Sequence, residues 1–424
     1  MPQAASKLRT HLTLALCVVL HSFTHAYAVI LVPLYLLMKA DLQLGGVKAA
    51  ALVVTVYGVV YNFGSYGAGM LADRVDRRLI LGIGLIGNAA AVAGFGLTRD
   101  YEAILLLAVA AGLFGTLFHP AANALVCALY PENPGMAIGL LGIGSGIGFF
   151  SGPQFAGWRA ERARWNWGGV SQWQKPCVEL GAAGAVLGLI FLLFGAEARE
   201  THRTVGAKMG RKLSREVVAL SAVLGWRDFA ATASISLVSI YLQRACGKNV
   251  EETGLIVGSM MLLGTVVNPL GVFLSHGRRR LPALTLVCVV GGAILATAPL
   301  WPVWAVLIPL AGFQTLQLGS YAISDAATLE RVSSSVRGRV VGVYLSLAGT
   351  LGALSPWCVG FWTDRLGPRA AQTHGYIALF AVLGAMMWVA AFSPLIIRRF
   401  GEPTGEKPIT LAEEIAPETM EGVV

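Results

Sequence analysis

The stretch Gly142 to Trp158, GIGSGIGFFSGPQFAGW, contains six glycines and one proline and carries no charge. In the interior of a soluble helix each glycine costs about 1 kcal/mol relative to alanine. In a bilayer, by contrast, small residues let helix backbones approach closely, and neighbouring helices accommodate a proline. The stretch therefore predicts a membrane helix that packs closely against another.

The composition of the whole chain indicates a polytopic membrane protein. Of its 424 residues, 55% are hydrophobic and 13% are charged, whereas soluble domains carry about 25% charged residues. The net charge of +9 does not indicate nucleic-acid binding, because Lys and Arg of a membrane protein collect in cytoplasmic loops. No nucleotide-binding run of Gly-x4-Gly-Lys-Ser/Thr occurs, so direct ATP drive is not expected. No spacing of a nucleophile and a base is readable, so we expect no enzyme, and we assign no cofactor.

Twelve hydrophobic segments have a length close to the roughly 20 residues that a helix needs to cross a bilayer. They cover residues 11–38, 47–71, 79–98, 103–130, 135–158, 177–196, 215–243, 251–275, 281–300, 302–330, 336–362 and 373–397. The chain is thus predicted to be an all-α membrane protein, and an even number of spans places both termini on one side.

The distribution of basic residues predicts the side. With the N-terminus inside, the inner segments hold 20 of the 32 Lys and Arg residues and the outer loops hold 11. This bias predicts a multi-pass protein of the cell membrane, the inner membrane in a bacterium, with both termini in the cytoplasm. The outer loop 159–176 is an exception to this distribution, because it is basic although it lies outside. It is also rich in Trp, and we interpret it as an interfacial segment lying on the bilayer.

The two halves of the chain repeat each other. Gly152-Pro153 followed by Gly157 matches Ser355-Pro356 followed by Gly360, and a Gly with two following arginines after segment 2 recurs after segment 8 at nearly the same offset. Such a duplication predicts two pseudo-symmetric six-helix bundles with a substrate site near the bilayer midplane between them. The predicted divisions are a cytoplasmic N-terminus (1–10), an N-terminal bundle (11–196), a cytoplasmic linker (197–214), a C-terminal bundle (215–400) and a disordered acidic tail (401–424).

The loop after segment 2 reads Gly69-Met-Leu-Ala-Asp-Arg-Val-Asp-Arg-Arg78 and resembles the signature loop of the major facilitator superfamily. Asp76 stands where that signature has glycine. The resemblance covers the chain to about residue 400 and implies a secondary transporter that works by alternating access. It also implies that the loop closes the inner side, through Gly69, Asp73, Arg74, Arg77 and Arg78; the alternative is a stop-transfer charge cluster.

The opening stretch is similar to the helix-5 motif of the antiporters in this superfamily. Together with its copy, it predicts a hinge at which the two bundles rock. The hinge residues are Gly148, Gly152, Pro153, Gly157, Pro356 and Gly360.

Within the superfamily, Phe118-His119-Pro120 and the pair His21 and His25 resemble the fosmidomycin-resistance group of exporters. That group has carboxylates where this chain has His25 and Ala121. Its drug/proton exchange therefore does not simply carry over.

The resemblance implies that helices 1, 4, 7 and 10 line a central cavity, and the polar residues of the membrane segments fall on these helices. They are His21, His25, His119, Arg227, Asp228, Gln314, Gln317 and Asp325. An ionised side chain at the midplane costs about 2.5–3.5 kcal/mol on insertion scales, so it is rarely without a role. Arg227 favours an anionic or zwitterionic substrate. Since adjacent residues of a helix do not face each other, we expect Arg227 to reach another helix, the alternative being a structural pair with Asp228.

Histidine titrates near neutral pH, so the three histidines are candidate proton switches, and Asp228 and Asp325 are candidate proton carriers. Three histidines with a carboxylate could also bind a transition metal. We assign no metal from the sequence, because no pattern of supporting residues around the histidines is visible.

The sequence therefore predicts a monomeric, proton-coupled exporter of a small organic solute, possible classes being anionic and amphipathic compounds. The partners expected are this solute, protons and the lipid bilayer. Three alternatives stay open: an importer of an organic acid or other nutrient, a lipid transporter, and a membrane sensor or assembly partner that moves nothing.

Overall fold

The computed structural model describes residues 2–72, 74–162, 169–196, 209–274, 279–333 and 336–401, without the side chains of residues 2–6, 66, 267–274 and 338. Within these ranges the chain is helical, with short connections. The predicted acidic tail 402–424, most of the predicted linker (197–208) and Asp73 lie outside the described residues.

The first half of the chain supplies eight α-helices and one short 3-10 turn. They are α1 (Pro2–Val29), η1 (Val32–Leu34), α2 (Tyr35–Asp41), α3 (Val47–Ala72), α4 (Arg77–Phe95), α5 (Tyr101–Gly115), α6 (Phe118–Leu129), α7 (Pro134–Glu161) and α8 (Gln174–Phe194).

The second half supplies the remaining helices. They are α9 (Arg211–Arg244), α10 (Val250–Leu274), α11 (Arg280–Thr297), η3 (Ala298–Leu300), η4 (Val303–Ala305), α12 (Leu307–Leu329), α13 (Arg337–Ala353), α14 (Ser355–Arg365), η6 (Gly367–Ala371), η7 (Thr373–Tyr376), α15 (Ile377–Ala390), α16 (Ser393–Ile397) and η8 (Arg398–Phe400).

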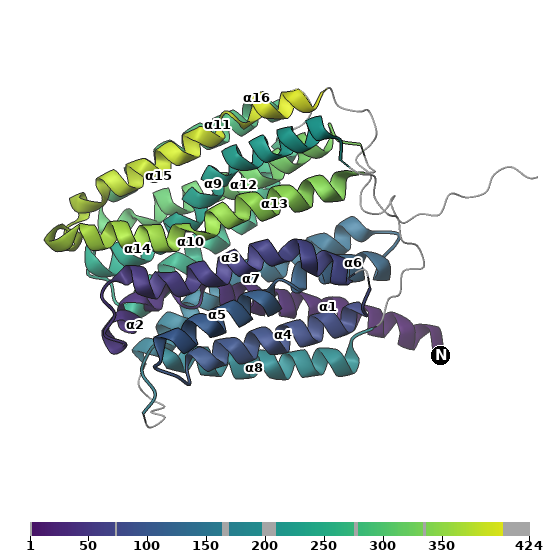
Figure 1. Cartoon of the computed structure of the whole chain (residues 1–424), viewed down its shortest axis with the longest axis horizontal. Coiled ribbons are helices and arrows are strands. Elements are labelled where there is room, and N and C mark those ends of the chain that lie inside the picture. Colours follow the sequence, from purple (N-terminus) through teal and green to yellow (C-terminus); the bar gives the residue numbers. More distant parts are fainter. Residues whose placement is uncertain are drawn as a thin grey trace, which may run out of the picture.

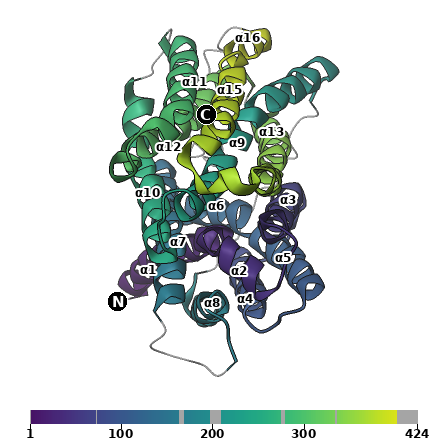
Figure 2. The same ribbon diagram turned by 90° about the vertical axis from the view of Figure 1, so that its left-hand side faces the viewer.

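These elements form two bundles, one from α1–α8 and one from α9–α16, which lie side by side in both views (Figures 1 and 2). In the described ranges, ten segments are long and apolar enough to cross a membrane, and α9 and α10 provide the other two of the twelve expected. The two-bundle architecture predicted from the internal repeat is confirmed. The start of α1 and the end of η8 lie at the same end of the molecule, which we call the terminal end; the opposite end is the far end (Figure 1).

Some boundaries differ from the sequence prediction for a clear physical reason. The segment predicted as 103–130 consists of α5 and α6, and the segment predicted as 336–362 consists of α13 and α14. Pro120 and Pro356 follow these breaks closely, because a proline has no N–H to continue the hydrogen bonding of the preceding turn. Helix α9 also begins at Arg211, inside the stretch that the sequence assigned to the linker.

The glycines of α7 serve two different contacts. A Cβ added at Gly144, Gly148 or Gly152 would collide with the backbone of α1 at Val18, Ser22 or Ala26. On another face, Gly157 lies against the carbonyl group of Val250 on α10. Glycine thus allows α7 to pack tightly inside its own bundle and also against the other bundle, as small residues do in membrane helices.

The two bundles are joined most closely at the far end. The backbone N–H groups of Val47 and Lys48 donate to the Asp364 carboxylate at 2.9 and 3.1 Å, and Arg162 forms an ion pair with Glu251 at 3.1 Å. At the terminal end the helices that meet across the interface have more room. A Cβ added at any of five glycines there would meet no atom of the described part of the chain within 4 Å: Gly67, Gly69, Gly135, Gly139 and Gly142.

The interpretation of loop 159–176 as an interfacial segment is wrong for its described ends. Arg159 belongs to α7, is 5% exposed and pairs with Glu179 at 2.7 Å. Trp173 is 1% exposed, and its indole N–H donates to the Asp41 carboxylate at 2.9 Å. These side chains are packed within the first bundle because each charged or polar group finds a partner there. The remaining tryptophans of the loop, Trp165 and Trp167, lie outside the described residues.

Candidate functional site

Arg227 is the centre of a polar cluster inside the second bundle. It is fully buried, and its guanidinium group donates to the Asp228 carboxylate at 2.9 Å, to the Ser324 hydroxyl at 3.0 Å and to the Tyr344 hydroxyl at 2.6 Å. The guanidinium carbon also lies 3.7 Å from the centre of the Tyr321 ring. Arg227 therefore does both things that the sequence treated as alternatives, because it pairs with the adjacent Asp228 and also reaches α12 and α13.

Asp325 belongs to the same cluster. It accepts a hydrogen bond from the Ser324 hydroxyl at 3.4 Å, and it lies close enough for its charge to interact with that of Arg227. Unlike Arg227, Asp325 and Tyr321 are partly exposed. The cluster thus combines one buried cation, two carboxylates and two phenols, and Asp325 and Tyr321 form its partly exposed side.

Gln314 and Gln317 lie on α12, about three and two turns before Asp325, and are 3% and 2% exposed. The side-chain oxygen of each has no hydrogen-bond partner among the described residues. A buried oxygen without a partner costs about 1–3 kcal/mol, so a bound donor would be favoured there.

The three predicted histidines form a second cluster, inside the first bundle. His21 and His25 lie one turn apart on α1, and His119 comes from α6. The ring centres are 4.7 to 5.4 Å apart, and the Nε2 atoms of His21 and His25 are within 2.9 Å of each other. The Nδ1 atom of His21 is 2.7 Å from the carbonyl oxygen of Leu141 on α7.

Aromatic rings surround the histidines. Phe118 stacks on His21 with ring centres 4.9 Å apart, and Phe149 lies 4.3 Å from His25. His21 is buried, whereas His25 and His119 are partly exposed. The aromatic rings pack around the three imidazoles, and two of the imidazoles keep part of their surface exposed.

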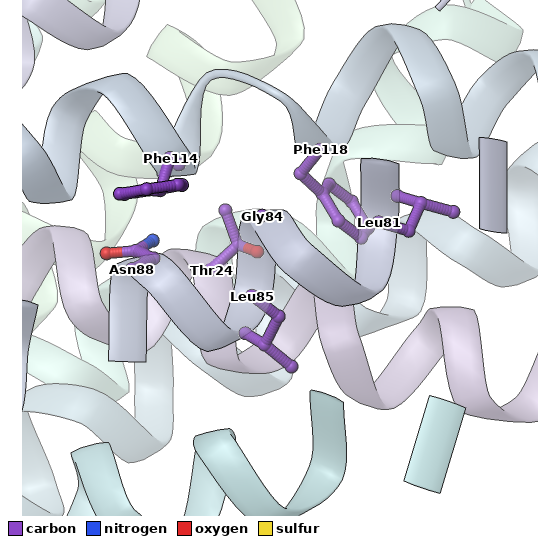
Figure 3. Close-up of a pocket in the computed structure, with 8 residues that line it drawn as sticks. Thr24, Leu81, Gly84, Leu85, Asn88, Phe114 and Phe118 are labelled. Carbon is purple, nitrogen blue, oxygen red and sulfur yellow. The ribbon is translucent and has the colours of Figure 1, made fainter. Parts of the chain in front are cut away.

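A small pocket lies close to this cluster, where Thr24 of α1 and Asn88 of α4 face Phe114 and Phe118 (Figure 3). It has no space for even a water-sized molecule. We therefore treat it as a packing defect of the first bundle and not as part of the site.

The loop after α3 is well defined on both sides of Asp73. Asp76 accepts a hydrogen bond from the backbone N–H of Arg78 and so caps the N-terminus of α4, a position that favours Asp. This explains how the loop turns without the glycine of the family signature. Arg77 is buried and donates to the Ala124 carbonyl group of α6, Arg74 is exposed, and Gly69 lies in the last turns of α3.

The six predicted hinge residues do not share one environment. Gly148 and Gly152 face α1 of their own bundle, whereas Gly157 and the carbonyl group of Pro153 face α10 across the interface. In the second half, Pro356 lies in the first turn of α14 and Gly360 packs against the backbone of Lys48. The two copies are therefore not equivalent, since α7 continues through Pro153 while the chain breaks before Pro356.

Sequence reasoning missed three partners of Arg227. Tyr321 and Ser324 could have been found, because polar residues recur every three or four positions along α12, from Gln314 through Gln317 to Asp325. Tyr344 is an isolated tyrosine in an apolar stretch, and no pattern in the sequence points to it.

The fold and these clusters define a membrane transport protein, and the family follows from comparison. Residues 14–356 match the model of the Major Facilitator Superfamily, so the chain belongs to this superfamily. It is a secondary transporter and not an enzyme.

Relatives of similar length support this assignment. The chain is 25% identical to the "Probable 4-methylmuconolactone transporter" of Cupriavidus pinatubonensis, over 88% of this chain and 89% of the relative. It is 26% identical to the "Multidrug resistance protein MdtG" of Escherichia coli, over 81% and 84% of the two chains.

Two solved structures share the fold. A bacterial homologue of the human lysosomal transporter Spinster, in an inward-facing and unoccupied conformation, aligns with a TM-score of 0.75 at 19% identity, over 92% of this chain and 98% of the other. A D-xylose–proton symporter aligns with a TM-score of 0.72 at 16% identity, over 94% and 99% of the two chains.

Proposed function

We propose that this chain moves a small organic anion together with a proton, and that the cluster around Arg227 is the binding and coupling site. The observation that carries the proposal is the buried guanidinium of Arg227, held by Asp228, Ser324 and Tyr344 beside the partly exposed Asp325. A planar guanidinium is suited to binding a carboxylate through two hydrogen bonds.

The charges of the cluster link the anion to the proton. With Asp228 and Asp325 ionised, the two carboxylates outnumber the one arginine, and a further anion would be repelled. A proton on either carboxylate removes one negative charge, and if it binds Asp228 it also frees the Nε side of Arg227. Anion and proton therefore favour each other's binding, which is the requirement for cotransport. Gln314 and Gln317, with unpaired oxygens, would hold hydrogen-bond donors of the substrate.

We assign the far end to the outer face and the terminal end to the cytoplasm. The excess of Lys and Arg near the terminal end supports this orientation. With this orientation, the state described here is closed at the outer face, where Gly157 and Gly360 lie in the contact between the two bundles. The loop that contains Arg74, Arg77 and Arg78 lies at the opposite, cytoplasmic end. In the opposite state this loop would close the inner side while the seam opens.

A second candidate function is export of a small organic compound by exchange for protons, which the sequence favoured. The likeness of the chain to the MdtG relatives, named for multidrug resistance, supports it, as does the glycine-rich α7. In that mechanism His21, His25 and His119 or the two carboxylates would take up the proton as the substrate leaves.

Purified protein in liposomes separates these functions. Cotransport predicts that an inward proton gradient drives uptake of a small carboxylate, such as a lactone acid or other monocarboxylate, above its equilibrium level. Arg227→Lys keeps the positive charge beside Asp228 but lacks the planar group that binds a carboxylate through two hydrogen bonds, so it should lose most of this uptake, while Arg369→Ala at the far end should leave it intact. Exchange predicts that the same gradient drives a loaded compound out. Full uptake by Arg227→Lys, or uptake that does not change with the proton gradient, contradicts the proposal.

A further inference from the structure

The three-histidine cluster is not needed for the anion site described above, and its geometry resembles a metal centre. Among the described residues, His21, His25 and His119 form a group whose ligand atoms all lie within 4.8 Å of one another. Nitrogen atoms around a tetrahedral zinc ion lie about 3.3 Å apart when each Zn–N bond is about 2.0–2.1 Å long. Side-chain rotations that move each ligand nitrogen by about 1 Å would therefore bring the three imidazoles to one ion.

The hydrogen bonds of His21 supply an independent observation. Since a carbonyl oxygen can only accept, the Nδ1 atom of His21 must carry the proton that it donates to Leu141. The Nε2 atom of neutral His21 is then a free lone pair, and it accepts from the Nε2–H of His25 at 2.9 Å. A ring N–H given to a backbone carbonyl is the usual arrangement that orients a metal-binding histidine.

We propose that His21, His25 and His119 bind one late first-row transition-metal ion of the Zn²⁺ class through their imidazole nitrogens. Imidazole ligands suit Zn²⁺, Cu²⁺ and Ni²⁺, while Mg²⁺ and Ca²⁺ require oxygen ligands. Three protein ligands leave a fourth position for water or an anion. The partial exposure of His25 and His119 gives the ion an approach.

The placement of the ligands has a consequence for transport. α1 and α6 belong to the same bundle, so a bound ion would move with that bundle and would not lock it to the other. Neutral His25 carries on Nε2 the proton that it donates to His21; when the ion binds at Nε2 this proton moves to Nδ1, and the imidazole stays neutral.

The test uses the full-length protein in detergent, with any affinity tag removed, titrated calorimetrically with Zn²⁺ and with Mg²⁺. We expect one equivalent of Zn²⁺ per chain, no Mg²⁺ binding, and a loss of at least tenfold in Zn²⁺ affinity in His25→Asn and His119→Asn. The matched control is His374→Asn, because His374 is exposed in η7 and lies outside the cluster.

X-ray absorption of the zinc-loaded wild type gives a result that does not depend on folding of the variants. Two or three imidazole nitrogens at about 2.0–2.1 Å support the site. One imidazole or none, or unchanged affinity in both histidine variants, would overturn it. Arg227→Lys keeps the positive charge beside Asp228 and should bind Zn²⁺ normally, so failure of the metal site and failure of the anion site can be told apart.

Discussion

Gly254 on α10 lies directly against the carbonyl oxygen of Pro153 on α7, so that a Cβ at this glycine would overlap the oxygen. The contact joins the two bundles near the far end, and Gly258 repeats it one turn later against the carbonyl oxygen of Phe150. Because these neighbours are backbone atoms, they cannot be moved aside by a change of side-chain rotamer. A larger residue at position 254 or 258 therefore opposes closure of the seam.

Gly254→Ala should weaken the state that is closed at the far end. Overpacking of this kind costs typically 1–3 kcal/mol, which corresponds to a 5- to 150-fold change in the ratio of two states. Spin labels on Lys39→Cys in α2 and Arg369→Cys in η6 would report a longer distance in a larger fraction of molecules. Gly142→Ala is the control, because among the residues that the structure describes a Cβ there meets nothing within 4 Å. Equal distance distributions in the two variants would contradict this prediction.

Asp364 should act as a latch between the bundles. Asp364 belongs to α14 of the second bundle, and it caps the N-terminus of α3 by accepting hydrogen bonds from the backbone N–H groups of Val47 and Lys48. Loss of a cap costs about 0.5–2 kcal/mol, so Asp364→Asn should shift the same label distances toward the open far end by roughly 2- to 30-fold in population. Glu251→Gln breaks only the surface ion pair with Arg162, which contributes about 0–1 kcal/mol. This variant should therefore shift the label distances less than Asp364→Asn does. A larger effect of Glu251→Gln would show that the capping contact is not the latch.

The extent to which the sequence predicted the molecule depends on the kind of interaction. The bundles and the histidines of α1 and α6 could be predicted, because apolar length, an internal repeat and a four-residue spacing are all visible in one dimension. Tyr344 could not, since its contact with Arg227 joins residues 117 positions apart. Nor could the burial of Trp173, because its partner Asp41 belongs to an element far away in the sequence.

Arg227 and Asp228 should depend on each other for stability. Removing one partner of a buried ion pair leaves the other charge without compensation and costs about 3–5 kcal/mol. We therefore expect Arg227→Ala to lower the thermal midpoint of the purified protein strongly, and the double variant Arg227→Ala/Asp228→Ala to recover part of the loss. Tyr344→Phe, which removes one hydrogen-bond acceptor from Arg227, should have a smaller effect than Arg227→Ala. Strictly additive losses in the double variant would show that the two charges are energetically independent.

Trp173 decides between two interpretations of the tryptophan-rich connection. At a lipid interface Trp173→Phe would be nearly neutral, because the ring would keep its amphipathic surroundings. In the structure the side chain is buried, and its indole donates to Asp41, which also pairs with Arg99 at 3.5 Å. The substitution then leaves a carboxylate with one donor fewer and should destabilise the protein by about 1.5–3 kcal/mol, the range for hydrogen bonds to charged groups. Trp304→Phe is the matched control: Trp304 is 85% exposed, and a surface substitution should change stability by no more than about 0.5 kcal/mol. Thermal unfolding of both variants in the same detergent measures the difference. Equal midpoints would contradict the buried contact and favour a position of Trp173 at the membrane surface.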